Sequence, residues 1–151
     1  MNLISSILPV ENVIIDTDST SKKRVFERVG ILFENTRQIA TSQVFDSLFA
    51  REKLGSTGLG QGVAIPHGRI KNLRDAVAAF VKTTTPIPFD APDSQPVNLI
   101  FALLVPERAT DLHLQHLGEL AQMFSDKNFR DQLQATNDPL VIHQLFVNWK
   151  A

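Results

Sequence analysis

The sequence predicts an α/β fold, a single-domain three-layer α/β/α sandwich in which helices cover both sides of a mixed central sheet. Segments with the apolar spacing of amphipathic helices alternate with short apolar segments typical of strands. The segment from 97 to 105 is apolar on both strand faces, as in a strand at the centre of a covered sheet. The 151 residues suit one domain, which we expect to span residues 1–151.

The first third of the chain contains one predicted strand and two predicted helices. Val13–Ile15 is a short strand candidate, and Ser21 can cap the helix that follows it. The apolar residues of that helix recur at helical spacing and are Val25, Phe26, Val29, Leu32 and Phe33. Thr41 or Ser42 can cap a second helix, which we expect to stop near Gly55. Its apolar face contains Val44, Phe45, Leu48 and Phe49.

The remaining predicted strands lie in the middle of the chain. Val63–Ile65 is a short candidate that leads into Pro66-His67-Gly68, and Ala76–Lys82 is a longer one. The segment from 86 to 96 contains four prolines and is predicted to be a loop. The apolar segment from 97 to 105 ends at Pro106, which cannot donate to a sheet ladder.

Three helices are predicted after the central strand. The first starts near Thr110, and shorter helices follow at Asp126–Leu133 and Pro139–Trp149. At about 100° per residue, the first of them presents one inward face. That face contains His113, Leu117, Leu120 and Phe124. His113 therefore lies in the turn that follows the carboxyl end of the central strand, where ligands bind in open α/β sheets.

Composition excludes several classes of function. The formal net charge of -1 provides no electrostatic footprint for nucleic acid. The absence of cysteine excludes disulfides, thiolate metal sites and thiol nucleophiles. The N-terminus has no basic leader, and no apolar run approaches the roughly 18 residues of a membrane span. We expect a cytoplasmic protein with no cofactor, no metal, no nucleic-acid partner and no membrane insertion.

His67 is the strongest candidate for a reactive residue. It follows a predicted strand and lies between Pro66, which fixes the backbone direction, and Gly68, which leaves space beside the ring. A neutral imidazole is nucleophilic near pH 7 and can accept and release a phosphoryl group. The alternative is a structural histidine that only makes hydrogen bonds, which is the commoner case for a lone histidine at the end of a strand.

The glycine-rich segment Gly55–Gly62 precedes this histidine. Its four glycines in eight residues predict a loop whose backbone N–H groups could bind a phosphate. Ser56 and Thr57 lie in this loop, and Arg51, just before it, could offer a guanidinium to the same anion. The alternatives are a plain turn and an arginine that complements the dipole of its helix.

The other histidines have competing interpretations. His113 is either part of the site or a half-buried core residue. The pair His113 and His116 could bind a metal, but no neighbouring carboxylate completes such a site. His143 is predicted to be structural or exposed.

The segment from Arg51 to Gly68 resembles, over eighteen contiguous residues, the active-site segment of IIA domains of the mannitol/fructose class in the bacterial phosphoenolpyruvate-dependent phosphotransferase system. The segments 86–91 and 95–106 and the pair His113-Leu114 fit the same family. The resemblance covers essentially the whole chain and looks closest to the free-standing nitrogen-regulatory branch, IIA-Ntr.

This resemblance implies a phosphohistidine phosphocarrier. A small carrier of the HPr or NPr kind would donate a phosphoryl group to His67, with Nε2 as the implied acceptor atom. The second active-site histidine falls on His113, the active-site arginine on Arg51, and Ser56 and Thr57 fall beside the phosphate. His116 has no assigned role. Implied partners are regulatory targets such as sensor kinases or potassium transporters.

Three functions remain open at this point. The first is a regulatory phosphocarrier of the nitrogen branch. The second is a sugar-specific IIA component that passes phosphate to a IIB domain during fructose or mannitol uptake. The third is a binding module with a dead site, against which the intact His67, His113 and Arg51 argue. No motif in the sequence identifies the regulatory targets or the oligomeric state.

Overall fold

The computed structural model describes residues 2–108 and 111–151 and contains a six-stranded mixed sheet. Its strands are β1 (Val13–Asp16), β2 (Gly58–Gly60), β3 (Val63–Ala64), β4 (His67–Ile70), β5 (Val77–Ile87) and β6 (Val97–Pro106). The order is β1-β5-β6-β3-β2, and β4 also pairs with β6. The pairs β1·β5, β3·β6 and β4·β6 are parallel, whereas β5·β6 and β2·β3 are antiparallel.

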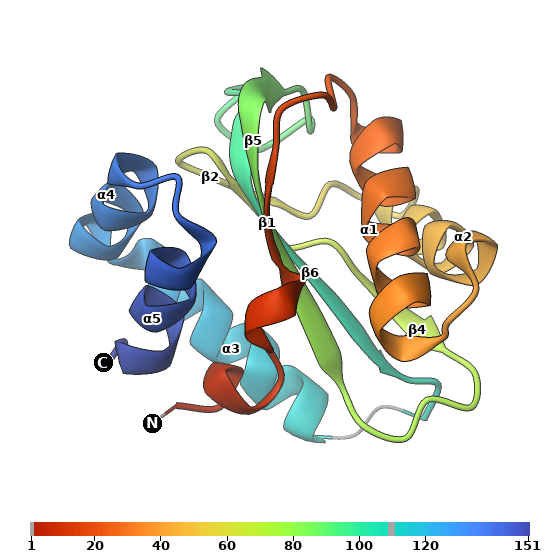
Figure 1. The fold of residues 1–151 in the computed structure, drawn as a ribbon. Helices are drawn as coiled ribbons and strands as arrows, with labels where there is room; N and C mark the ends of the chain where they lie inside the picture. The colour runs from red at the N-terminus through yellow and green to blue at the C-terminus, as the bar shows by residue number, and fades with distance from the viewer. Residues whose placement is uncertain (1, 109–110) are drawn as a thin grey trace.

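Helices cover both sides of this sheet, so the predicted three-layer sandwich is confirmed (Figure 1). One side carries α1 (Lys22–Arg37) and α2 (Thr41–Glu52). The other side carries α3 (Asp111–Ser125), α4 (Lys127–Ala135) and α5 (Pro139–Asn148), together with the short 3-10 helix η1 (Ile4–Ser6). A second 3-10 helix, η2 (Val10–Asn12), leads into β1. No helix in the described part of the chain is both long and apolar enough to cross a membrane.

The central strand β6 supports two separate apolar cores. Alternate residues point to opposite faces of a strand. Leu99, Phe101 and Leu103 pack on the α3–α5 side, and Ile100, Ala102 and Leu104 pack on the α1–α2 side. This arrangement explains why the segment is apolar on both faces except at Asn98, as the prediction of a strand covered on both faces requires.

Polar residues set the helix starts, mostly where the sequence predicted them. Ser21 caps α1 by accepting a hydrogen bond from the N–H of Arg24 at 3.2 Å. The prediction that Thr41 or Ser42 caps α2 is wrong, because Ala40 occupies the cap position and Thr41 is the first helical residue. The Glu34 carboxylate takes over the capping role by accepting from the N–H and the hydroxyl of Thr41, at 2.8 and 3.1 Å.

Several predicted boundaries differ from the structure. The loop predicted from 55 to 62 contains β2, which forms a hairpin with β3 through Gln61 and Gly62, both at positive φ. The predicted strand at 76–82 extends to Ile87, and α2 ends at Glu52 rather than near Gly55. The expected start of the third helix at Thr110 lies outside the described residues, and α3 is described from Asp111.

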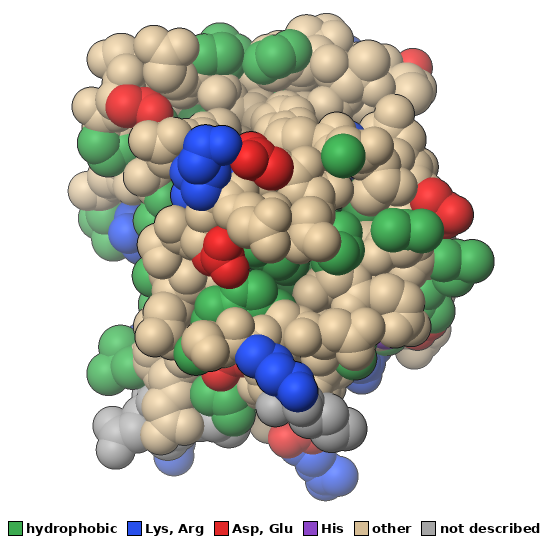
Figure 2. Space-filling model, turned by 90° about the vertical axis from the view of Figure 1, so that its left-hand side faces the viewer, with side chains coloured by type: hydrophobic (Ala, Val, Ile, Leu, Met, Phe, Trp, Pro, Cys, Tyr) green, Lys and Arg blue, Asp and Glu red, His purple; other side chains and the backbone are tan. Residues whose placement is uncertain are grey.

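The outer face formed by the C-terminal helices has mixed charge. Figure 2 shows this side of the molecule, where acidic and basic side chains are interspersed among apolar and uncharged polar ones. The distribution agrees with the formal net charge of -1. On this face neither charge sign forms a concentrated patch.

Candidate active site

A break in the strand next to β6 positions His67. β3 pairs in parallel with the first half of β6, and β4 pairs with its second half in the same register, so that His67 lies opposite Leu103. Ile65 and Pro66 form the interruption, since a proline has no N–H to donate to a ladder. The Pro66 carbonyl still accepts from the N–H of Leu103 at 3.0 Å. His67 therefore begins a strand, whereas the sequence placed it after the end of one.

Gly68 allows α2 to approach the sheet beside His67. A Cβ atom at position 68 would lie 2.9 Å from the backbone carbonyl carbon of Ser47 in α2. Any side chain there would push α2 away from β4. Because neighbouring side chains alternate along a strand, His67 points to the opposite face, toward α3. The space that the absent side chain of Gly68 leaves is thus filled by α2.

The His67 ring is held in one tautomer and faces a second histidine. Its Nδ1 lies 2.9 Å from the carbonyl oxygen of Ile65. A carbonyl can only accept, so Nδ1 carries the proton and Nε2 keeps its lone pair. The ring centroids of His67 and His113 are 5.7 Å apart, with an angle of 51° between the ring planes. The structure therefore places His113 of α3 beside His67.

Burial keeps both rings neutral near pH 7. It is the largest cause of the lowered pKa of His67; the hydrogen bond to Ile65 opposes it, and the Arg51 charge adds to it. The pKa of His113 is also lowered, first by burial and then by the nearby His67, Arg69 and His116. Neutral imidazole is the nucleophilic form of histidine, so the environment favours attack by His67.

A pocket of about 400 Å³ lies over these two rings, between α2 and the first turns of α3. Two arginines flank it. Arg51 donates from Nη1 to the Gly55 carbonyl at 2.8 Å, and Arg69 donates from Nη1 to the Glu107 carbonyl at 2.9 Å. Both side chains line the pocket, where they can supply positive charge to a bound anion.

Arg69 is a site residue that the sequence reasoning missed. It lies two positions after His67 in β4, so the period of two places both side chains on the same strand face. That signal was available only if 67–70 had been recognised as a strand. The sequence reasoning ended the strand at Ile65 and therefore could not use it.

Ser56 and Thr57 lie outside the pocket. The Ser56 hydroxyl donates to the Phe89 carbonyl and accepts from the N–H of Gly58 at 3.0 Å. The hydroxyl and the N–H of Thr57 both donate to the Glu52 carboxylate. The structure thus brings His67, His113 and Arg51 together, and it engages the two hydroxyls in contacts within the chain.

A buried ion pair anchors the segment that contains these hydroxyls. Lys22 Nζ lies 3.1 Å from Glu52 Oε2, and the Glu52 side chain is only 3% exposed. The Thr57 carbonyl accepts from the N–H of Ile65 at 3.0 Å, and the Ile65 carbonyl holds His67 Nδ1. Glu52 therefore connects to the His67 ring through Thr57 and Ile65.

The two remaining histidines are separate from this pocket. His143 Nε2 lies 2.9 Å from the Leu8 carbonyl, in agreement with the predicted structural role. His116 is buried and lines a second cavity. Within residues 2–108 and 111–151, no group of three or more histidine, aspartate or glutamate side chains is arranged to hold a metal ion.

The chain is similar to known proteins over nearly its whole length. The family model described as phosphoenolpyruvate-dependent sugar phosphotransferase system, EIIA 2, matches residues 6–149. The nitrogen regulatory protein of Escherichia coli is 40% identical over 147 residues, covering 96% of this chain and 90% of that protein. The crystal structure of the nitrogen regulatory protein IIA-Ntr from Neisseria meningitidis superposes with a TM-score of 0.89 at 49% identity, covering 95% of this chain and 99% of the other.

Sugar-specific relatives are more distant. The fructose-specific EIIA component of Haloferax volcanii is 30% identical over 131 residues, covering 86% of this chain and 85% of that protein. The nitrogen regulatory relative is therefore more similar to this chain in sequence than the fructose-specific relative.

Proposed function

The chain belongs to the EIIA 2 family of the phosphoenolpyruvate-dependent sugar phosphotransferase system, and from this premise we propose that it is a phosphohistidine phosphocarrier of the nitrogen-regulatory branch. His67 accepts a phosphoryl group from a small carrier of the HPr or NPr kind. The phosphorylation state of His67 then sets how the protein interacts with regulatory targets. Residues 1–151 act as one functional unit.

The arrangement of the His67 ring carries this proposal. Its Nδ1–H donates a hydrogen bond to the Ile65 carbonyl oxygen, with an N···O distance of 2.9 Å. The lone pair of Nε2 is therefore left as the nucleophile. The ring lies at a pocket flanked by arginines and next to His113. A purely structural histidine would require neither a neutral ring nor a pocket with two arginines and a second histidine beside it.

Transfer proceeds in line between two imidazoles. The Nε2 lone pair of His67 forms the new N–P bond while the N–P bond of the donor phosphohistidine breaks, and that electron pair returns to the donor ring. The three equatorial oxygens carry the charge in a loose transition state. Because Nδ1 keeps its proton, the phosphorylated His67 ring is cationic, which makes it a good leaving group for the next transfer.

The neighbours of His67 stabilise the transferring group. His113 has a neutral ring that can donate one N–H to a phosphoryl oxygen. Arg51 and Arg69 place positive charge at the same pocket and complement the negative oxygens. Ser56 and Thr57 support the backbone of this site through Phe89 and Glu52, and the proposal assigns them no phosphate contact.

The test is phosphorylation in a reconstituted system. The chain is incubated with phosphoenolpyruvate, enzyme I and an HPr- or NPr-type carrier, and the acid-labile phosphopeptide is mapped. We expect the label on His67 and its complete loss in His67→Ala. The matched control is His143→Ala, which removes a histidine bonded to the Leu8 carbonyl far along the chain and should keep the label. A His67→Ala protein that still accepts phosphate would contradict the assignment of His67 as the phosphoryl acceptor.

A second arm separates regulation from sugar uptake. The nitrogen-regulatory relative is 40% identical, against 30% for the fructose-specific relative. We therefore expect the phosphorylated chain to be a poor donor to fructose or mannitol IIB domains. Transfer to a IIB domain as fast as phosphorylation by the carrier would favour the sugar-specific function instead.

A further inference from the structure

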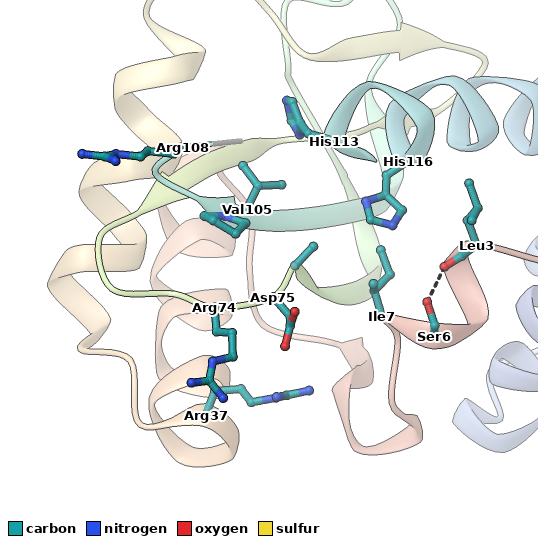
Figure 3. Close-up of a pocket in the computed structure, with 12 residues that line it drawn as sticks. Leu3, Ser6, Ile7, Arg37, Arg74, Asp75, Val105, Arg108, His113 and His116 are labelled. Atoms are coloured by element: carbon teal, nitrogen blue, oxygen red, sulfur yellow. Dashed lines mark hydrogen bonds between the residues drawn. The ribbon is translucent and has the colours of Figure 1, made fainter. Parts of the chain in front are cut away.

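A second cavity, of about 590 Å³, lies on the other side of His113 from the active-site pocket. It forms where the carboxyl end of β6, the turn before β5, the end of α1 and η1 meet (Figure 3). His113 and Val105 line both cavities, so the second one adjoins the site of phosphoryl transfer without containing His67.

The charged side chains around this cavity are mainly basic. Arg37, Arg74 and Arg108 line it together with one carboxylate, that of Asp75. The guanidinium groups exceed the carboxylate by two positive charges, in a chain whose formal net charge is -1. Within the described part of the chain, none of the three arginines forms an ion pair with an acidic side chain. Guanidinium groups that lack acidic partners favour a bound oxyanion.

A buried histidine with an unused nitrogen points into the same cavity. His116 is 3% exposed, and Figure 3 shows its ring projecting from α3 toward Ile7. Its Nδ1 has no hydrogen-bond partner among the described residues. A buried polar atom without a partner costs free energy, and a ligand or an ordered water in the cavity would remove that cost. Burial also lowers the pKa of His116, so its ring is neutral and has one N–H to donate.

The remaining wall of the cavity is apolar. Leu3 and Ile7 from the N-terminal segment, Ala76 before β5, and Val105 in β6 contribute to it. A ligand that fits both parts of the wall combines charged oxygens with a short apolar carbon chain. A free inorganic ion would use only the basic part.

We propose that this cavity is a binding site for a small organic dianion, held by Arg37 and Arg74 and in contact with His116. The shared chemistry is two negative charges on oxygen attached to a short carbon chain, from either a phosphate monoester or a dicarboxylate. The site is distinct from the phosphorylated histidine. Its occupancy can be measured on the unphosphorylated chain alone, so a failure here would leave the proposed phosphocarrier function untouched.

The test is titration of the isotope-labelled chain followed by NMR, near neutral pH and at low salt. Butyl phosphate and succinate serve as the two probes and distinguish the phosphate source from the carboxylate source. We expect saturable shifts of the His116 ring signals and of the Arg74 and Asp75 amides with at least one probe. Added salt should weaken binding, because screening reduces the attraction of exposed guanidinium groups.

Variants connect the shifts to the cavity. Arg74→Ala and Arg37→Ala should each weaken binding about tenfold, as expected for loss of a hydrogen bond to a charged group. Arg28→Ala is the matched control, since Arg28 is an exposed arginine of the same helix as Arg37 but lies outside the cavity. His116→Gln, which keeps a donor near the same place, should retain more affinity than His116→Leu.

Two results would overturn the proposal. One is the absence of saturable shifts with both probes. The other is equal weakening by Arg28→Ala and Arg74→Ala, which would mean that the probes respond only to the general charge of the surface.

Discussion

The segment from Glu52 to His67 connects two polar clusters, and they differ in how many of their polar atoms form hydrogen bonds. The first, which we call the Glu52 cluster, consists of Lys22, Glu52, Ser56 and Thr57. Its carboxylate oxygens, ammonium group and hydroxyls all have partners within the chain. The second is the histidine pair, His67 and His113. His67 uses only Nδ1, and the buried Nδ1 of His113 has no partner among the described residues.

Because of this difference, we assign stability to the Glu52 cluster and chemistry to the histidine pair. A buried polar group with all its hydrogen bonds made contributes to a fixed structure and has nothing left to offer a substrate. A neutral ring with a free lone pair costs some stability and remains available for reaction. The fixed Glu52 cluster holds Thr57, Thr57 holds Ile65, and Ile65 orients the reactive ring. The following predictions test this division, from the largest expected effect to the smallest.

Removing the carboxylate of the Glu52 cluster should cost the most stability. Glu52→Ala leaves the Lys22 ammonium and the Thr57 N–H and hydroxyl without their acceptor. We expect a loss of about 3 kcal/mol in the free energy of unfolding, because one charge of a buried pair is left uncompensated. Urea denaturation provides the measurement. Glu27→Ala removes the exposed partner of Arg24 and should cost only about 0.5 kcal/mol. Equal losses in the two variants would mean that the buried pair contributes no more to stability than the surface pair.

Replacing the second histidine should affect chemistry far more than stability. His113→Gln removes a ring whose centroid is 5.7 Å from that of His67. We expect phosphoryl transfer to His67 to slow about 100-fold, as for loss of one donor to a developing charge. The unfolding midpoint should stay close to that of the parent protein. Rapid-quench labelling with the phosphorylated carrier measures the rate, and an unchanged rate would exclude His113 from the site.

Arg51 lies between the two clusters, and its effect should be intermediate. Its Nη1 is already engaged by the Gly55 carbonyl, so only part of its charge is available to phosphate. Arg51→Ala should slow transfer about tenfold, the size expected for a hydrogen bond to a charged group. Arg51→Lys should recover little of this rate, since an ammonium cannot bond Gly55 and an oxyanion with the same fork. Full recovery by lysine would mean that only net charge matters there.

The fold was largely predictable because its signals are local. The apolar spacing of α1 and α2 and the two-sided apolar character of β6 appear directly in the sequence. The strand β4 was missed because it has only four residues and includes a histidine, a glycine and an arginine. It exists because it pairs with β6 over Leu103–Pro106, a tertiary contact that no local pattern contains.

The site was predictable in part for the same reason. His67 and His113 could be identified from the motif and from the helical face, and the structure brings them together. Ser56 and Thr57 were associated with phosphate because the family resemblance places them in the loop beside it. Their actual partners, Phe89 and Glu52, belong to other segments, and hydrogen bonds between segments cannot be read from spacing alone.

The smallest expected effect is a pH dependence of stability that arises from the buried histidines. The pKa values of His67, His113 and His116 are all lowered from 6.5, in each case first by burial. Below about pH 6.5 the unfolded chain binds protons that the folded chain resists, so the unfolded state is favoured. Stability should therefore be complete above this pH and decrease as the pH falls toward the lower folded values.

Urea midpoints at about pH 7.5 and pH 5.5 measure this effect between the ordinary pKa ranges of carboxylates and lysines. Asp16, whose pKa is lowered below 3.8, stays ionised throughout, so the Asp16–Ser19 contacts contribute no slope. His116→Gln should reduce the difference between the two midpoints, because it removes a buried ring whose protonation is disfavoured in the folded state. The Glu52 cluster contains no histidine, so Glu52→Ala should lower both midpoints and change their difference less than His116→Gln does. A difference that disappears in Glu52→Ala but is unchanged in His116→Gln would mean that the buried histidines are not its source.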